Sequence, residues 1–168
     1  IFISLGSTGN NDAAIYRSFN GGNNWENLDA VADMQYYRIH SMIYTNDYLF
    51  IASEKTYRSN DLGITWEDIS ITLPHSSYRE IIERKDTLYL LPQDEGVYYY
   101  SSDYGSSWEE VDIPVAPNAT TNSIEILSDF TFIGYWGPGI TRYDSRSGVS
   151  EYYSEGITNA IIHNFLFK

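Results

Sequence analysis

One eight-residue pattern occurs three times in the chain at nearly equal intervals. Each copy has the form Ser-x-Asp/Asn-x-Gly-x-x-Trp, and the copies end at Trp25, Trp66 and Trp108. The intervals between these tryptophans are 41 and 42 residues, and one more interval leads to a degenerate copy at 145–148 that lacks the tryptophan. A period of this length indicates stacked structural units, each of which needs its neighbours to bury its apolar face. The fold is therefore expected to be repetitive, with about four units in 168 residues.

The residues between the copies favour short strands. Before the second copy, two apolar or β-branched runs at 39–44 and 48–52 are separated by Thr45-Asn46-Asp47. Runs at the same phase recur at 80–83 with 87–91 and at 123–127 with 130–134. The 16 tyrosines, 7 phenylalanines and 4 tryptophans also favour strands over helices. Four short strands in about 42 residues are typical of a propeller blade, so we expect an all-β β-propeller of four-stranded antiparallel blades.

Each copy of the pattern is predicted to form the hairpin between the third and fourth strands of a blade. Its glycine can adopt the positive φ that such a turn requires. Its Asp or Asn can accept hydrogen bonds from amides of the same loop, and its Trp can cover the hairpin and bury apolar area against the next sheet. The residues given this structural role are Ser18, Asn20, Gly22, Trp25, Ser59, Asp61, Gly63, Trp66, Ser101, Asp103, Gly105 and Trp108. Arg17 and Arg58, which precede two of the serines, are expected to pack between blades.

The three copies resemble the Asp-box, or bacterial neuraminidase repeat (BNR), of sialidases, sortilin-type receptors, some xyloglucan-active glycosidases and photosystem-assembly propellers. The resemblance implies that the boxes lie on the rim, away from the ligand face. We expect one propeller domain or segment over 1–168, with blade repeats at 1–29, 30–70, 71–112 and 113–153 and the start of another at 154–168. Since Asp-box propellers usually have six or more blades, a segment of a larger propeller is favoured. The alternative is a four-bladed ring closed by the last inner strand.

The composition argues against several classes of function. With 23 acidic and 10 basic residues the formal charge is −13, which argues against a general nucleic-acid binder and favours a basic partner. The chain has no cysteine, and its three histidines show no metal-site spacing, so neither a metal nor another cofactor is expected. No apolar run approaches the roughly 20 residues of a transmembrane helix. The family resemblance alone implies an extracytoplasmic location.

Candidate ligand-binding residues lie on the loops predicted to surround the propeller axis. Tyr-Arg recurs where two inner strands begin, while the third blade has Thr120-Thr121 at this phase. Two arginines near the axis could bind a carboxylate, or each could pair with one of the many acidic residues. Trp136 could stack on a ligand or pack on a neighbouring blade. The candidates are Tyr37, Arg38, His75, Tyr78, Arg79 and Trp136.

These features predict a non-catalytic recognition scaffold that binds a protein, peptide or glycan through its loop face. The alternative is a sialidase-like or endo-glucanase-like glycoside hydrolase, whose catalytic residues would lie partly outside this sequence. Such an enzyme needs two carboxylates across a cleft, and Glu54, Asp94 and Glu95 are the loop-face candidates. The chain contains no Arg-Ile-Pro motif, and the arginine triad that binds a carboxylate in sialidases is not reproduced. No residue is therefore assigned as catalytic.

Overall fold

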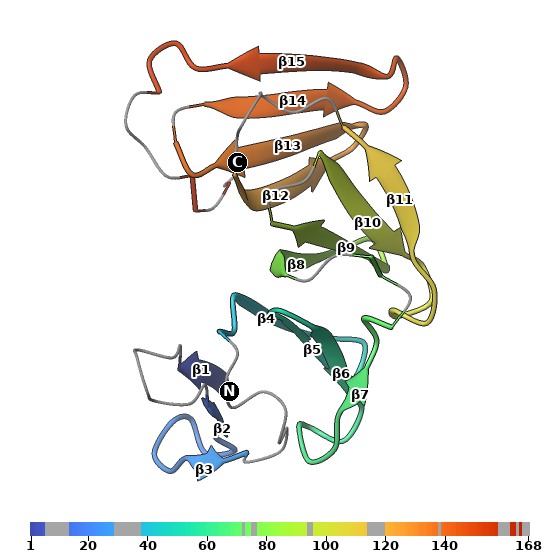
Figure 1. The fold of residues 1–168 in the computed structure, drawn as a ribbon. Coiled ribbons are helices and arrows are strands. Elements are labelled where there is room, and N and C mark those ends of the chain that lie inside the picture. Colours follow the sequence, from blue (N-terminus) through green and yellow to red (C-terminus); the bar gives the residue numbers. More distant parts are fainter. Residues whose placement is uncertain are drawn as a thin grey trace.

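Four antiparallel β-sheets follow one another along the chain in the computed structural model (Figure 1). The structure describes residues 1–5, 14–28, 38–71, 73–74, 77–93, 96–113, 120–137, 139–157, 162–163 and 165. The first sheet contains β1 (Phe2–Leu5), β2 (Ala14–Arg17) and β3 (Glu26–Asn27). The second contains β4 (Ser41–Thr45), β5 (Tyr48–Ala52), β6 (Thr56–Ser59) and β7 (Glu67–Asp68). The third contains β8 (Tyr78–Arg84), β9 (Thr87–Pro92), β10 (Val97–Ser101) and β11 (Glu109–Asp112). The fourth contains β12 (Thr121–Leu127), β13 (Phe130–Tyr135), β14 (Ile140–Asp144) and β15 (Val149–Tyr153).

In each sheet, consecutive strands pair in sequence order, which is the meander of a propeller blade. The described part of the chain contains no helix, so the predicted all-β class is confirmed. The first two strands of the second sheet are joined by Asn46 and Asp47, both at positive φ, as a tight two-residue hairpin requires. Lys85 and Asp86 repeat this turn in the third sheet. The paired apolar runs predicted from the sequence are therefore real hairpins.

The apolar core lies between successive sheets. Phe50 of β5 and Ile81 and Leu90 of the third sheet are fully buried in one cluster, which holds the second and third sheets together. Equivalent clusters lie at the other two junctions, around Ile51 and around Ile133. The second and third sheets therefore bury both faces, because a neighbouring sheet lies on each side of them.

Each loop formed by the repeated pattern, which we call a box, is held by its own serine and by its Asp or Asn side chain. In the second copy, Gly63 N donates to Ser59 Oγ at 2.7 Å, and Thr65 N donates to Asp61 Oδ1 at 2.8 Å. Hydrogen bonds from the Thr65 side chain and backbone are the main reason why the pKa of Asp61 is lowered to about 2. The first and third copies repeat the serine and aspartate contacts, with Asn20 in place of the aspartate in the first. In all three copies the serine and the Asp or Asn side chain therefore accept hydrogen bonds from amides of their own loop.

The box glycines are required both by backbone conformation and by space. Gly63 has φ of +88° and Gly105 of +84°. A Cβ atom on Gly63 would lie 2.6 Å from Leu28 Cδ1, and one on Gly105 would lie 2.7 Å from Ile69 Cδ1. Leu28 and Ile69 each directly follow the last strand of the preceding sheet. Each of these two boxes therefore receives an apolar side chain of the blade before it.

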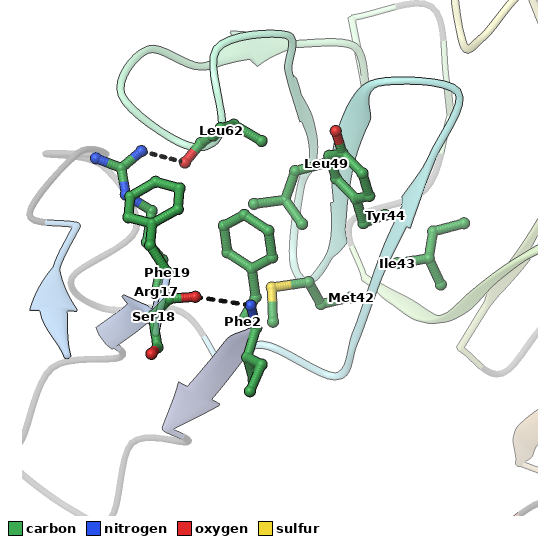
Figure 2. A pocket seen from close by; sticks show the side chains of 10 residues that line it. Phe2, Arg17, Ser18, Phe19, Met42, Ile43, Tyr44, Leu49 and Leu62 are labelled. Carbon is green, nitrogen blue, oxygen red and sulfur yellow. Dashed lines mark hydrogen bonds between the residues drawn. The ribbon is translucent and has the colours of Figure 1, made fainter. Parts of the chain in front are cut away.

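An arginine also joins each of the first two sheets to the next box. Arg17 Nη1 donates to Leu62 O at 2.8 Å, as Figure 2 shows, and its Nε and Nη2 donate to Glu26 at 3.0 and 2.9 Å. Arg58 repeats this arrangement, with Nη1 donating to Tyr104 O at 2.7 Å and Nε to a glutamate of its own hairpin. The expectation that these two arginines pack between blades is confirmed.

We predict that Trp66→Ala lowers the free energy of unfolding by about 2–4 kcal/mol, because the half-buried ring packs on Gly63 and on the cluster around Ile51. Trp25 is the matched control: it occupies the same box position but is 40% exposed. Trp25→Ala is expected to cost less than half as much in urea unfolding. Equal losses for both variants would show that the tryptophans act only within their own hairpins.

Candidate functional site

A polar cavity of about 390 Å³ lies where the inner strands of three sheets begin. The inner strands β4, β8 and β12 lie side by side, with β8 in the middle. The lining side chains are Arg38, His40, Ser41, Arg79, Glu80, Asn122, Trp136 and His163, together with Ile39. We call this cavity the inner pocket. It brings together three of the predicted ligand-binding residues, Arg38, Arg79 and Trp136.

Two β-bulges direct side chains into the inner pocket. The register of β8 on β9 shifts between Tyr78 and Glu80, and that of β12 on β13 shifts between Thr121 and Ser123. The residues at these shifts, Arg79 and Asn122, both line the pocket. Bulges of this kind re-aim side chains beside functional sites.

Arg79 and Asn122 therefore occupy the same structural position. His40 holds this position in the preceding blade, because Ser41 pairs with Ala52 as Glu80 pairs with Leu91, and Arg38 lies two residues before His40. The sequence alignment had placed Thr120-Thr121 at the phase of Tyr-Arg, and this placement is wrong by one residue. Thr121 is the counterpart of Tyr78, because both begin an inner strand one residue before the register shift. The third equivalent side chain is thus the amide of Asn122, which the sequence analysis missed.

Tyr78 does not face the inner pocket as predicted. Its side chain is fully buried in the core between the second and third sheets, and its amide donates to Ser53 O at 2.7 Å. Strand alternation explains the difference, because Tyr78 and Arg79 are adjacent on β8 and point to opposite sides. Tyr37 and His75 lie outside the described residues.

Arg79 contacts both His40 and Trp136. Its Nη1 lies 3.3 Å from His40 Nδ1, and its guanidinium carbon lies 5.7 Å from the centre of the Trp136 ring, within cation–π range. Burial, together with the charges of Arg79 and Arg38, lowers the pKa of His40 to about 4. His40 is therefore neutral at pH 7, and the positive charge of the pocket comes from the arginines.

Glu80 is the one carboxylate among the described residues that line the pocket. Burial raises the pKa of Glu80 to about 7, and the nearby charge of Glu125 also raises it, while the hydrogen bond from Ile124 N and the charge of Arg84 lower it. Ile124 N donates to Glu80 Oε2 at 2.5 Å, which fixes the carboxyl group against β12. Arg84 is itself engaged by Glu125 through two hydrogen bonds.

The carboxylates proposed for a glycosidase do not gather in the described structure. Glu54 lies half-buried in the turn between β5 and β6 and is not among the residues that line the inner pocket. Asp94 and Glu95 lie outside the described residues. Among the residues that the structure describes, no group of three or more His, Asp or Glu side chains could hold a metal ion.

A second cavity, of about 500 Å³, lies between the first and second sheets (Figure 2). Its lining is mainly apolar, with Phe2, Met42 and Tyr44 around the junction, and the rings of Phe2 and Tyr44 stack at 5.9 Å. Arg17, which also lines it, is already bonded to Glu26 and Leu62. We treat this cavity as part of the blade junction rather than as a ligand site.

No protein-family model matches the chain, and no curated protein matches it. Solved structures do match, all at low sequence identity. Nidogen in its complex with laminin is 10% identical, with a TM-score of 0.60, over 90% of this chain and 60% of that chain. YCF48 bound to a D1 peptide is 16% identical, with a TM-score of 0.51, over 91% and 72%. The extracellular domain of BT4673 from B. thetaiotaomicron is 16% identical, with a TM-score of 0.61, over 97% and 21%.

At these identities the similarity shows the fold alone. The structural neighbours are β-propeller proteins, and this chain has the blade architecture of a propeller. It spans about three fifths of the matched nidogen chain and about one fifth of the BT4673 domain. No helix in the described residues is long and apolar enough to cross a membrane.

We predict that Glu80→Gln stabilises the protein at pH 8 by about 2–3 kcal/mol, because it removes a buried charge and keeps an acceptor for Ile124 N. The folded-state pKa of Glu80, about 7, lies above its ordinary value of 4.5. The carboxyl group therefore contributes most to stability below pH 4.5, and this contribution is lost as the pH rises to 7. Thermal melts of parent and variant from pH 4 to 8 test this, and a difference that stays constant over the range would contradict it.

Proposed function

We propose that this chain is a non-catalytic recognition propeller that binds a protein or peptide ligand through the inner pocket. One observation carries the proposal: hydrogen-bond donors from three successive blades, Arg38, Arg79 and Asn122, line one pocket together with Trp136. Hydrogen-bond donors that converge beside an exposed aromatic ring are typical of ligand sites. A glycan ligand would use the same donors and the same ring.

The chemistry of the pocket favours a ligand that carries a carboxylate. Arg38 and Arg79 supply fixed positive charge, since guanidinium groups remain protonated at physiological pH. Guanidinium groups bind carboxylates through paired, charge-assisted hydrogen bonds. The formal charge of −13 still favours a basic partner over the surface as a whole, but the inner pocket has the opposite preference.

Trp136 extends this site with apolar contact area. Its ring is 48% exposed, and Trp136 N donates to Thr120 O, which fixes the backbone beside β12. A half-exposed ring beside a guanidinium can cover an aliphatic or aromatic group of a ligand at little cost in side-chain entropy. The expected ligand therefore presents a carboxylate with an apolar group next to it.

The structural neighbours support a binding role in general terms. Some of these propellers bind proteins or peptides, as in the nidogen–laminin complex and in YCF48 with its D1 peptide. We propose an extracytoplasmic location, which the BT4673 extracellular domain supports. We also propose that the chain forms part of a larger Asp-box propeller, since it spans only part of most of its neighbours.

Glu80 favours a second candidate function, glycoside hydrolysis. A buried carboxyl group with a pKa near 7 suits a general acid. Both glycosidase geometries require a second carboxylate across the scissile bond, and the described lining of the inner pocket supplies none. Turnover of fluorogenic sialosides or glucan oligosaccharides that Glu80→Gln abolishes would establish the enzyme and overturn the binding proposal.

We predict that Arg38→Gln and Trp136→Ala each weaken ligand binding by about ten-fold or more, with the melting temperature nearly unchanged. The probe is a library of short synthetic peptides with free carboxylates, compared with the same library in amidated form. Lys85→Gln is the matched control, since Lys85 lies in the exposed turn between β8 and β9 and does not line the inner pocket.

Binding of a carboxylate peptide can also be followed through the pKa of His40. A bound carboxylate offsets the charges of the neighbouring arginines, so the pKa of His40 should rise from about 4 when the ligand binds. Equal enrichment of carboxylate and amide peptides, or unchanged binding by Arg38→Gln, would contradict the proposed site.

A further inference from the structure

Glu80 occupies an inner-strand position that holds serine in the blades before and after it. Ser41, Glu80 and Ser123 each pair with the fifth residue of the second strand of their sheet, so the three positions are equivalent. Ser41 Oγ donates to Ile81 O at 3.3 Å, and Ser123 Oγ donates to Ile162 O at 2.8 Å. A serine is therefore sufficient to join an inner strand to the segment that lies beside it.

The carboxyl group of Glu80 makes the equivalent contact between the third and fourth sheets. Ile124 N donates to Glu80 Oε2 at 2.5 Å, and Ile124 holds the same place in its strand as Ile81, the partner of the serine in the second sheet. The exchange of serine for glutamate thus keeps a bond across the junction. It also adds an ionisable group to the inner pocket, which the junction itself does not require.

The charged form of this group is disfavoured by its surroundings. Glu80 is half-buried, and burial is the main reason why its pKa is raised to about 7. Glu125 on β12 raises the pKa further through its like charge, while Arg84 lowers it but is engaged by Glu125 through two hydrogen bonds. Another negative charge brought close to Glu80 would act as Glu125 does and favour the protonated form.

The inner pocket brings the proposed carboxylate ligand close to this group. Arg38 and Arg79, the expected partners of that carboxylate, line the same cavity of about 390 Å³ as Glu80. His40 also lines it and is neutral at pH 7, since burial and the charges of the two arginines lower its pKa to about 4. His163 is the remaining titratable side chain of the described lining.

We infer that Glu80 couples ligand binding in the inner pocket to proton uptake: its carboxyl group gains a proton from solvent when a ligand carboxylate binds to Arg38 and Arg79. This inference rests on the proposed function and adds regulation by pH to it. When Glu80 is ionised, its charge repels the ligand carboxylate and offsets one of the two guanidinium charges. Because linkage is reciprocal, a ligand that favours the protonated carboxyl group binds more weakly to the ionised one. The affinity is therefore highest below pH 7 and falls as the pH rises through 7.

Isothermal titration calorimetry between pH 6 and pH 9 tests the coupling. The probe is a carboxylate peptide selected from the library described above. Its dissociation constant should rise about ten-fold over this range, a size typical of the coupling between two binding events. At pH 7.5 the measured binding enthalpy should also differ between phosphate and Tris buffers, because the proton that Glu80 gains is supplied by the buffer.

Two substitutions of Glu80 separate this coupling from other effects of pH. Glu80→Ser introduces the residue of the neighbouring blades, and Glu80→Gln keeps an acceptor for Ile124 N. In both variants the ratio of the dissociation constants at pH 9 and pH 6 should fall to about one, and the dependence on buffer should disappear. His163→Gln is the matched control, because it removes the other titratable side chain of the lining and should keep the ten-fold ratio.

The outcomes distinguish the coupling from the binding site itself. A peptide that binds the parent protein equally well at pH 6 and pH 9 would overturn the coupling and leave the proposed site intact. A pH dependence that persists in Glu80→Gln, or that is lost in His163→Gln, would assign the proton to another group and overturn the inference as well. If no carboxylate peptide binds at any pH, the proposed function fails and the coupling fails with it.

Discussion

The structure depends on the hydrogen bonds that a serine and an aspartate or asparagine make within each box loop. These bonds hold a glycine and the residue before it at positive φ, which has two consequences for the neighbouring sheet. The carbonyl of the residue before the glycine accepts an arginine of the preceding blade, and the missing side chain of the glycine leaves space for an apolar residue. Each box turn therefore closes its own hairpin and also binds side chains of the preceding sheet. Repetition of this turn every 41 or 42 residues stacks the sheets in series.

The contacts between the outer strands of successive sheets also place the inner strands next to one another. Because β4, β8 and β12 lie side by side, residues at one position of the repeat come together at one place. In this chain that position holds His40, Arg79 and Asn122, and bulges in β8 and β12 turn the last two of these side chains into the pocket, which Arg38 also lines. The contacts between blades require the same residue types at the outer strands of successive repeats, whereas the residues of the inner strands can differ from blade to blade. A propeller can thus change its ligand without disturbing its blade junctions.

Much of this arrangement could be predicted from the sequence, because the box residues interact within a few positions of one another. The strand runs, the turn at Asn46-Asp47 and the positive φ of Gly63 follow from local chemistry. The inner pocket was predicted only in part. Arg38, Arg79 and Trp136 were identified, but Asn122 was missed, because a bulge adds one residue and shifts the phase of the repeat. Tyr78 was misplaced because the pattern of a Tyr-Arg pair does not tell which of the two residues faces the core.

The raised pKa of Glu80 and the lowered pKa of His40 were beyond the reach of the sequence. Both shifts come mainly from burial between sheets that are about 40 residues apart in the chain, and no local pattern records that burial. The same limit applies to the ion pair of Arg142 with Glu151. Its spacing is readable once the contacts of Arg17 and Arg58 are known, and not before.

Native-state hydrogen exchange at the three box glycines tests most directly whether a box is locked by the blade before it. The amides of Gly22, Gly63 and Gly105 all donate to the serine of their own box, so local hydrogen bonding is the same in all three. Among the described residues, an apolar side chain of a preceding sheet covers Gly63 and Gly105 but not Gly22. In dilute solution, Gly63 and Gly105 should exchange as slowly as the core strands, and Gly22 much faster through local opening. Equal protection of all three amides would contradict the account, because the apolar residue that covers Gly63 or Gly105 would then add nothing to the stability of its box.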